Sequence, residues 1–161
     1  MALAVDKNAL VTELVARVAA ALAAARAAHR AATEGATHEQ ARPENSKDTR
    51  GLEQSYVARG QAARVAELEE SLAVLQVFAP RQFGDSDAVA LGALVDVDEE
   101  GAGHRYFIAP HGGGEVLASG SVQVVTPASP LGQALLGRRA GDVAELRLRG
   151  PARELEIVAL A

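Results

Sequence analysis

The stretch VVTPASPLGQALLGRRAGDV, residues 124–143, predicts a strand, a short helix and a turn in close succession. Ser129-Pro130 opens the helix, because serine caps a helix N-terminus and proline suits its first position. Gly137 can end the helix in the left-handed conformation, and Gly141-Asp142 suits a tight turn into the next strand. The helix would cover the concave side of a sheet with three leucines, Leu131, Leu135 and Leu136.

Short runs of apolar residues on both sides of this stretch predict a small sheet. Alternation and glycine-rich turns place its strands at residues 89–97, 104–109, 120–126, 143–149 and 153–159. With the helix at residues 130–136, this pattern predicts an α+β domain over residues 88–161, built on a curled antiparallel sheet.

Residues 1–79 have a different composition, rich in alanine and poor in glycine, which favours helix. Asp6 or Asn8 could cap the first helix, and a second would begin near Pro43 and end at Pro80. Two apolar stripes at three- and four-residue spacing predict an antiparallel α-helical coiled-coil hairpin over residues 1–79, followed by a linker at 80–87. The stripes are Leu10, Leu14, Val18, Ala21, Ala25 and Ala28, then Val65, Leu68, Leu72 and Leu75.

Composition excludes several classes of site and partner. The 161 residues contain no cysteine, so the chain has no disulfide and no thiolate site. The formal net charge is −5, which disfavours direct binding to DNA. No run approaches ~18 residues free of charge, so we expect no membrane span. We expect a cytoplasmic monomer with a protein partner.

Two segments resemble the C-terminal signature of the Gre transcript-cleavage factors: residues 124–143 and the ending RELEIVAL at 153–160. Residues 56–69, YVARGQAARVAELE, also resemble the descending helix of that family. The resemblance implies a coiled-coil hairpin followed by an FKBP-like domain with one short helix. It also implies a transcription elongation factor that binds RNA polymerase at the secondary channel and assists cleavage of backtracked RNA. The polymerase would remain the enzyme, and the nascent RNA 3′ end would be met only inside that complex.

In the Gre family two acids at the hairpin tip help the polymerase to hold a catalytic Mg²⁺, an ion that prefers oxygen ligands. Residues 42–49, RPENSKDT, match this tip. Glu44 aligns with the first acid, whereas an ungapped alignment places Lys47 at the second. A one-residue shift supplies Asp48, which shares a helix face with Glu44. We therefore expect Glu44 and Asp48 to be the catalytic, metal-holding pair, although acids in a first helical turn are also favoured by the helix dipole.

Five residues around the short helix are candidates for contact with the polymerase: Ser129, Pro130, Leu131, Arg138 and Arg139. Ser129 can equally be explained as a helix cap, and the two arginines as a solvated turn. Three other functions compete with cleavage assistance. They are a cleavage-inactive regulator that occupies the channel, a structural coiled-coil adaptor, and a prolyl isomerase, which the few aromatic residues of this half disfavour.

Overall fold

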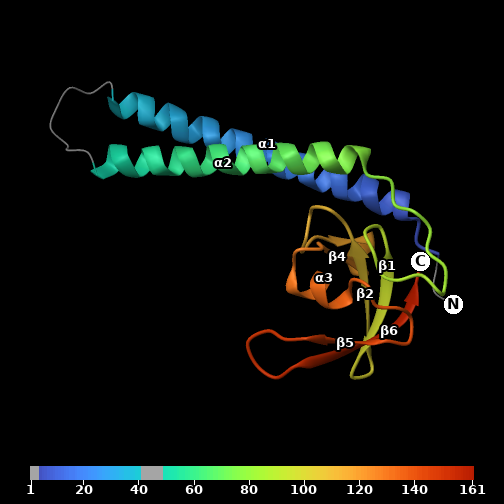
Figure 1. The fold of residues 1–161 in the computed structure, drawn as a ribbon. Coiled ribbons are helices and arrows are strands. Elements are labelled where there is room, and N and C mark those ends of the chain that lie inside the picture. Colours follow the sequence, from blue (N-terminus) through green and yellow to red (C-terminus); the bar gives the residue numbers. More distant parts are fainter. Residues whose placement is uncertain (1–3, 41–48) are drawn as a thin grey trace. The chain divides into compact units, whose positions relative to one another are not determined.

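The computed structural model describes residues 4–40 and 49–161 (Figure 1). The chain divides into two compact units. One comprises residues 16–73, and the other comprises the residues up to Val15 together with those from Val74 onward.

The first unit is an antiparallel pair of long helices, which confirms the predicted hairpin. Helix α1 spans Lys7–Gln40 and helix α2 spans Thr49–Val77. They run side by side in opposite directions (Figure 1), and the Arg26 guanidinium donates to the Glu69 carboxylate across the pair at 2.8 Å. The buried positions between residues 16 and 73 recur at helical spacing: Val18, Leu22 and Ala25 on α1, and Leu68 and Ser71 on α2.

The burial of α1 differs from the predicted stripe in two places. Leu22 is buried where Ala21 was expected, and Ala28 is exposed. A leucine buries more apolar area than an alanine, so the helix turns the larger side chain inward. The helix also continues through Gly35, where the sequence predicted a weakening.

Asp6, rather than Asn8, caps the start of α1. Its carboxylate accepts a hydrogen bond from the Asn8 N–H at 2.9 Å, and its carbonyl accepts the N–H of Leu10 at 3.1 Å. These two bonds satisfy backbone donors that a helix start leaves unpaired. The predicted helix start at Pro43 lies outside the described residues.

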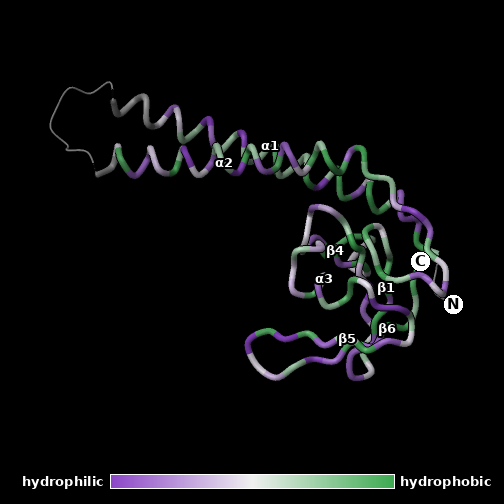
Figure 2. Tube along the Cα trace, in the orientation of Figure 1, coloured by the Kyte–Doolittle hydropathy of each residue, from purple (hydrophilic) through white to green (hydrophobic). Residues whose placement is uncertain are grey.

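Alanine makes α1 apolar along much of its length, as Figure 2 shows. By length and composition alone, residues Lys7–Gly35 could cross a membrane, a test that core helices of soluble proteins also pass. This range still contains charged residues such as Glu13, Arg17 and Arg26, so it is not a run free of charge.

The second unit contains a six-stranded sheet with the order β3-β4-β2-β1-β6-β5. A single 3₁₀ turn, η1 (Ala118–Gly120), links the two outermost strands at one edge. The strands are β1 (Leu94–Glu99), β2 (Ala102–Ile108), β3 (Val116–Leu117), β4 (Val122–Val125), β5 (Val143–Leu146) and β6 (Arg153–Leu160).

The sheet is mixed, which corrects the prediction of an antiparallel one. Strand β4 lies between β3 and β2, pairing antiparallel with β3 and parallel with β2. After β2 the chain therefore passes to the edge of the sheet as β3 and returns as β4, next to β2. A strand of two residues is too short to show an alternation of apolar and polar residues in the sequence. The predicted strand start at residues 89–93 is a loop, because Gly92 has φ +89° and packs against Pro80.

Helix α3 (Pro130–Leu135) confirms the predicted capped helix. The Ser129 hydroxyl accepts the Gly132 N–H at 3.0 Å and donates to the Thr126 carbonyl at 2.8 Å. Leu135 is fully buried in the core, and Leu131 and Leu136 pack partly buried against it. Most of the rest of that core comes from strands β1, β2, β4, β5 and β6: Val95, Val97, Tyr106, Ile108, Val125, Ala144, Leu146, Leu155 and Ile157.

Gly132 allows α3 to pack closely against Thr126 in the preceding loop. We predict that Gly132→Ala lowers the free energy of unfolding of the sheet domain. A Cβ at this position would lie 2.0 Å from the Thr126 carbonyl oxygen, so backbone must shift, at a cost of about 1–3 kcal/mol or more. Denaturant unfolding measures this loss. Gly103→Ala is the control, since its Cβ would enter open space. Equal stability of the two variants would contradict the packing.

Candidate functional site

A cavity of about 430 Å³ lies beside α3 in the second unit. Three of the five predicted contact residues, Ser129, Pro130 and Leu131, line one side of it. Strand β4, the end of β5 and the loop after it supply much of the rest, including Val124, Leu146 and Leu148. The fold therefore gathers the predicted Ser-Pro-Leu segment and distant strand residues around one recess.

The lining of this cavity mixes apolar side chains with polar ones, which include Gln123, Thr126 and Ser129. Val124 and Leu146 are buried, whereas Leu148 is 52% exposed. Tyr106 is the one aromatic residue among the described residues that line the cavity, so an aromatic-walled isomerase pocket is not formed there. Burial, and then the charge of Glu99, raises the pKa of the Tyr106 hydroxyl, which keeps it protonated as a donor.

Arg153 contributes the single charge among the described residues of the lining. Its guanidinium holds the Glu99 carboxylate in a two-pronged ion pair, with Nη2 to Oε2 at 2.6 Å. This hydrogen bonding raises the pKa of Arg153 and lowers the pKa of Glu99. The Arg153 side chain is 47% exposed and that of Glu99 only 16%, so the pair presents mainly the cation to solvent.

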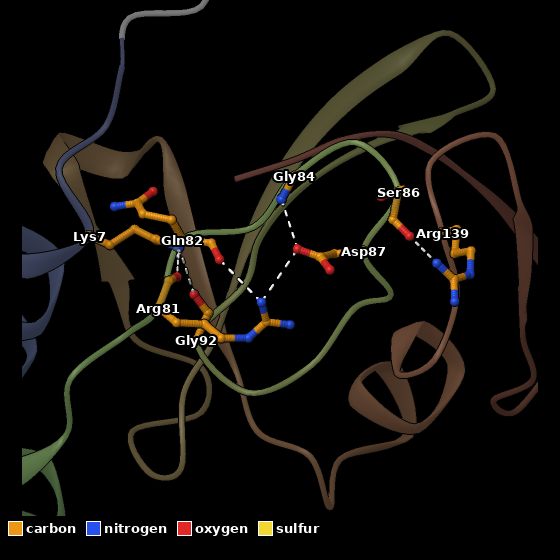
Figure 3. A network of polar contacts seen from close by, with 8 residues as sticks. All are labelled: Lys7, Arg81, Gln82, Gly84, Ser86, Asp87, Gly92 and Arg139. Atoms are coloured by element: carbon orange, nitrogen blue, oxygen red, sulfur yellow. Dashed lines mark hydrogen bonds and ion pairs between the residues drawn. The ribbon is translucent and has the colours of Figure 1, made fainter.

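Arg138 and Arg139 do not line the cavity. Both follow α3 in the turn before β5. This turn is hydrogen-bonded to the loop before β1, as Figure 3 shows for Arg139 and Ser86. The Arg139 guanidinium donates to the Ser86 carbonyl, and the Arg138 carbonyl accepts the Val89 N–H at 2.7 Å. The side chains of both arginines are exposed, so they remain candidates for a separate contact.

Glu44 and Asp48, the predicted catalytic and metal-holding pair, lie outside the described residues. Within residues 4–40 and 49–161, no group of three or more His, Cys, Asp or Glu side chains is placed to hold a metal ion.

A buried lysine at the start of α1 is a feature that the sequence reasoning missed (Figure 3). Lys7 is only 4% exposed, and its ammonium donates to the carbonyls of Arg81 and Gly92, the latter at 3.2 Å. It also lies 4.9 Å from the centre of the Phe83 ring. Burial, followed by repulsion from Arg81, lowers the pKa of Lys7. Its position three residues before Leu10, on the apolar stripe, was the available signal.

Two further contacts join the first turns of α1 to the sheet domain within the same unit. The Glu13 carboxylate accepts the Ala118 N–H at 2.9 Å, beside the left-handed residues Ala118 and Ser119. Leu14 packs on Gly112, where a Cβ would lie 2.6 Å from a leucine methyl carbon. The base of α1 is therefore part of the sheet domain's own packing.

We predict that Lys7→Ala destabilises this unit by about 1–3 kcal/mol, because two carbonyls lose their buried donor. Thermal and denaturant unfolding measure the effect. Arg30→Ala, an exposed cation on the same helix, serves as the matched control and is expected to change stability little. A Lys7→Ala variant as stable as the control would show that the buried ammonium does not hold the domain together.

A family model described as "Transcription elongation factor, GreA/GreB, C-term" matches residues 84–161. A GreA from Polaromonas naphthalenivorans (strain CJ2) is 32% identical over 122 residues, which cover 74% of this chain and 70% of that protein. A GreA from Jannaschia sp. (strain CCS1) is 36% identical over 99 residues, 61% of this chain and 60% of that protein. This alignment spans less than two thirds of the Jannaschia protein.

The transcription inhibitor protein Gfh1 of Thermus thermophilus is also similar, at 29% identity over 114 residues, 70% of this chain and 71% of that protein. A crystal structure of GreA factor homolog 1 (Gfh1) from Thermus thermophilus matches 91% of this chain and 94% of its own, with 23% identity and a TM-score of 0.40. Some of the similar proteins are thus named as transcription elongation factors and others as a transcription inhibitor.

Proposed function

Because this chain belongs to the GreA/GreB family of transcription elongation factors, we propose that it binds RNA polymerase and acts through it. The chain would not itself be an enzyme, since the polymerase would supply the catalysis. It would work in the cytoplasm, where the polymerase is. The observation that carries the proposal is the capped helix α3 beside an open cavity with a partly apolar lining; the segment that forms the helix carries the family signature.

The sheet domain supports the docking half of this function. A largely apolar cavity with a few fixed polar groups is the usual form of a recognition site. Ser129, Pro130 and Leu131 would meet the polymerase there, with Arg138 and Arg139 as a second contact after the helix. The Ser129 cap fixes the segment before binding, so little ordering entropy would be lost on docking.

The paired helices support the second half, entry of the hairpin into the polymerase's secondary channel. Helix α2 alone has 29 residues and so extends about 43 Å at 1.5 Å per residue. At the tip, Glu44 and Asp48 would help to hold Mg²⁺ at the polymerase's catalytic centre, where the ion promotes cleavage of backtracked RNA. Carboxylates are suitable ligands for this ion.

A cleavage-inactive regulator of the polymerase is the second candidate. Lys47 occupies the second acid position in the ungapped alignment, and an inhibitor is among the similar proteins. Such a protein would dock in the same way but would lack the acid pair. Binding and cleavage therefore need separate measurements.

We predict that the purified chain binds core RNA polymerase in the absence of DNA. Leu148→Asp should weaken this binding about tenfold, because it puts a charge at the mouth of the apolar cavity. Leu91→Asp is the control, since Leu91 is an exposed leucine that does not line the cavity. Binding that is absent for the unaltered chain, or unaffected by Leu148→Asp, would count against this docking.

For the tip, we predict that backtracked elongation complexes shorten their RNA faster when the chain and Mg²⁺ are added. Glu44→Ala combined with Asp48→Ala should abolish the stimulation while polymerase binding persists. Glu53→Ala, an exposed acid on α2, should leave it unchanged. If the unaltered chain binds RNA polymerase but does not stimulate RNA cleavage, the result favours a cleavage-inactive regulator instead.

A further inference from the structure

Backbone strain in the sheet domain is concentrated in the loop between β3 and β4. Among the described residues, three that are not glycine have a left-handed backbone: Glu100, and the consecutive pair Ala118 and Ser119, with φ of 51° and 56°. The Cβ of an L-residue is crowded in this conformation, which glycine adopts freely. The loop therefore holds alanine and serine, in succession, in a conformation that their own chemistry disfavours.

The strands on either side of this loop give it little support. Strand β3 has two residues and lies at the edge of the sheet, with β4 as its neighbour. Within the loop, the Ala118 carbonyl accepts the Ser121 N–H at 3.3 Å and the Ser121 hydroxyl at 2.8 Å. A short hairpin of this kind is only marginally stable by itself. A contact from outside the hairpin is therefore needed to hold the left-handed pair.

The first turns of α1 supply that contact, and they belong to the same compact unit as the loop. The Glu13 carboxylate accepts the Ala118 N–H at 2.9 Å. A hydrogen bond to a charged acceptor is stronger than one to a neutral acceptor. The next residue, Leu14, is fully buried and packs on Gly112, in the loop that leads to β3. Two adjacent residues of α1 thus hold the chain on both sides of β3.

Strand β4 connects this loop to the cavity beside α3. It begins at Val122, directly after the loop, and its residues Gln123, Val124 and Val125 line the cavity. The Val124 N–H also donates to the Glu115 carbonyl at 2.8 Å, which joins β4 to the chain just before β3. A change in the loop would therefore move the β4 wall of the cavity.

We propose that the β3–β4 loop is a strained conformational switch, which Glu13 of α1 keeps in its left-handed form. While the first turns of α1 are in place, the bond to the carboxylate outweighs the strain. When they move away, Ala118 and Ser119 relax to negative φ, and β4 shifts with them. The switch couples α1 to the cavity within the chain itself, so the inference does not depend on polymerase binding.

Amide hydrogen exchange of β4 in the whole chain, together with the NMR Cα shifts of Ala118 and Ser119, tests this coupling. Glu13→Ala should raise the exchange rate of residues 122–125 about tenfold and move both Cα shifts away from left-handed values, because the loop loses its charged acceptor. Glu13→Gln keeps an oxygen acceptor, so it should raise exchange less than Glu13→Ala. Glu34→Ala, an exposed acid farther along α1, should leave exchange within about twofold.

Glycines at the strained positions distinguish a switch from an ordinary structural hydrogen bond. Ala118→Gly combined with Ser119→Gly removes the strain, so the loop should stay left-handed without Glu13. In this background Glu13→Ala should raise β4 exchange no more than about twofold. Glu100→Gly relieves the same kind of strain in the β1–β2 turn and is the matched control. In that background Glu13→Ala should still raise exchange about tenfold.

Unchanged β4 exchange in a folded Glu13→Ala variant overturns the inference. An equal increase with and without the glycine pair also overturns it, because an ordinary hydrogen bond would give that result. If Glu13→Ala alone fails to fold, the glycine pair should restore a cooperative melting transition, and a chain that stays unfolded contradicts the switch. RNA polymerase enters none of these measurements, so the proposed function is tested separately.

Discussion

The close approach of α3 to the Thr126 carbonyl is the constraint on which the sheet domain depends. Ser129 joins the two through one hydroxyl, which donates to that carbonyl and accepts the Gly132 N–H. Only a glycine fits at position 132, because any Cβ would collide with the same oxygen. With α3 fixed in this way, Leu135 enters the core while Leu131 remains at the cavity. The Ser129 cap therefore stabilises the sheet domain and also positions the residues proposed to contact the polymerase.

The base of α1 belongs to the same domain as the sheet. Lys7 is buried between backbone carbonyls and an aromatic ring, and Glu13 and Leu14 meet two loops that leave the sheet. Burying an ammonium group costs free energy unless its N–H donors are hydrogen-bonded. The contact therefore requires the Lys7 ammonium to meet these carbonyls and would not form between arbitrary apolar surfaces. Helix α1 thus starts within the sheet domain before it pairs with α2.

Much of this fold could be predicted from the sequence, since its signals are local. The cap at Ser129 and the stop at Gly137 are short-range patterns with a direct physical cause, and the helical stripes repeat over many turns. The parallel pairing of β4 with β2 could not be predicted from the sequence, because it depends on the two-residue strand β3 at the edge of the sheet. Lys7 and Arg153 were missed for a related reason. Their partners lie far away in sequence, at Gly92 and Glu99.

For the candidate site, the sequence placed Ser129, Pro130 and Leu131 correctly on one helix start but could not reveal the cavity that they share with Leu146 and Leu148. Amide hydrogen exchange of the whole chain, with and without saturating core RNA polymerase, tests the docking of this face most directly. The account predicts slower exchange in the exposed loop at residues 147–152 when polymerase is bound. Unchanged exchange there, with protection confined to the face opposite the cavity, would contradict it.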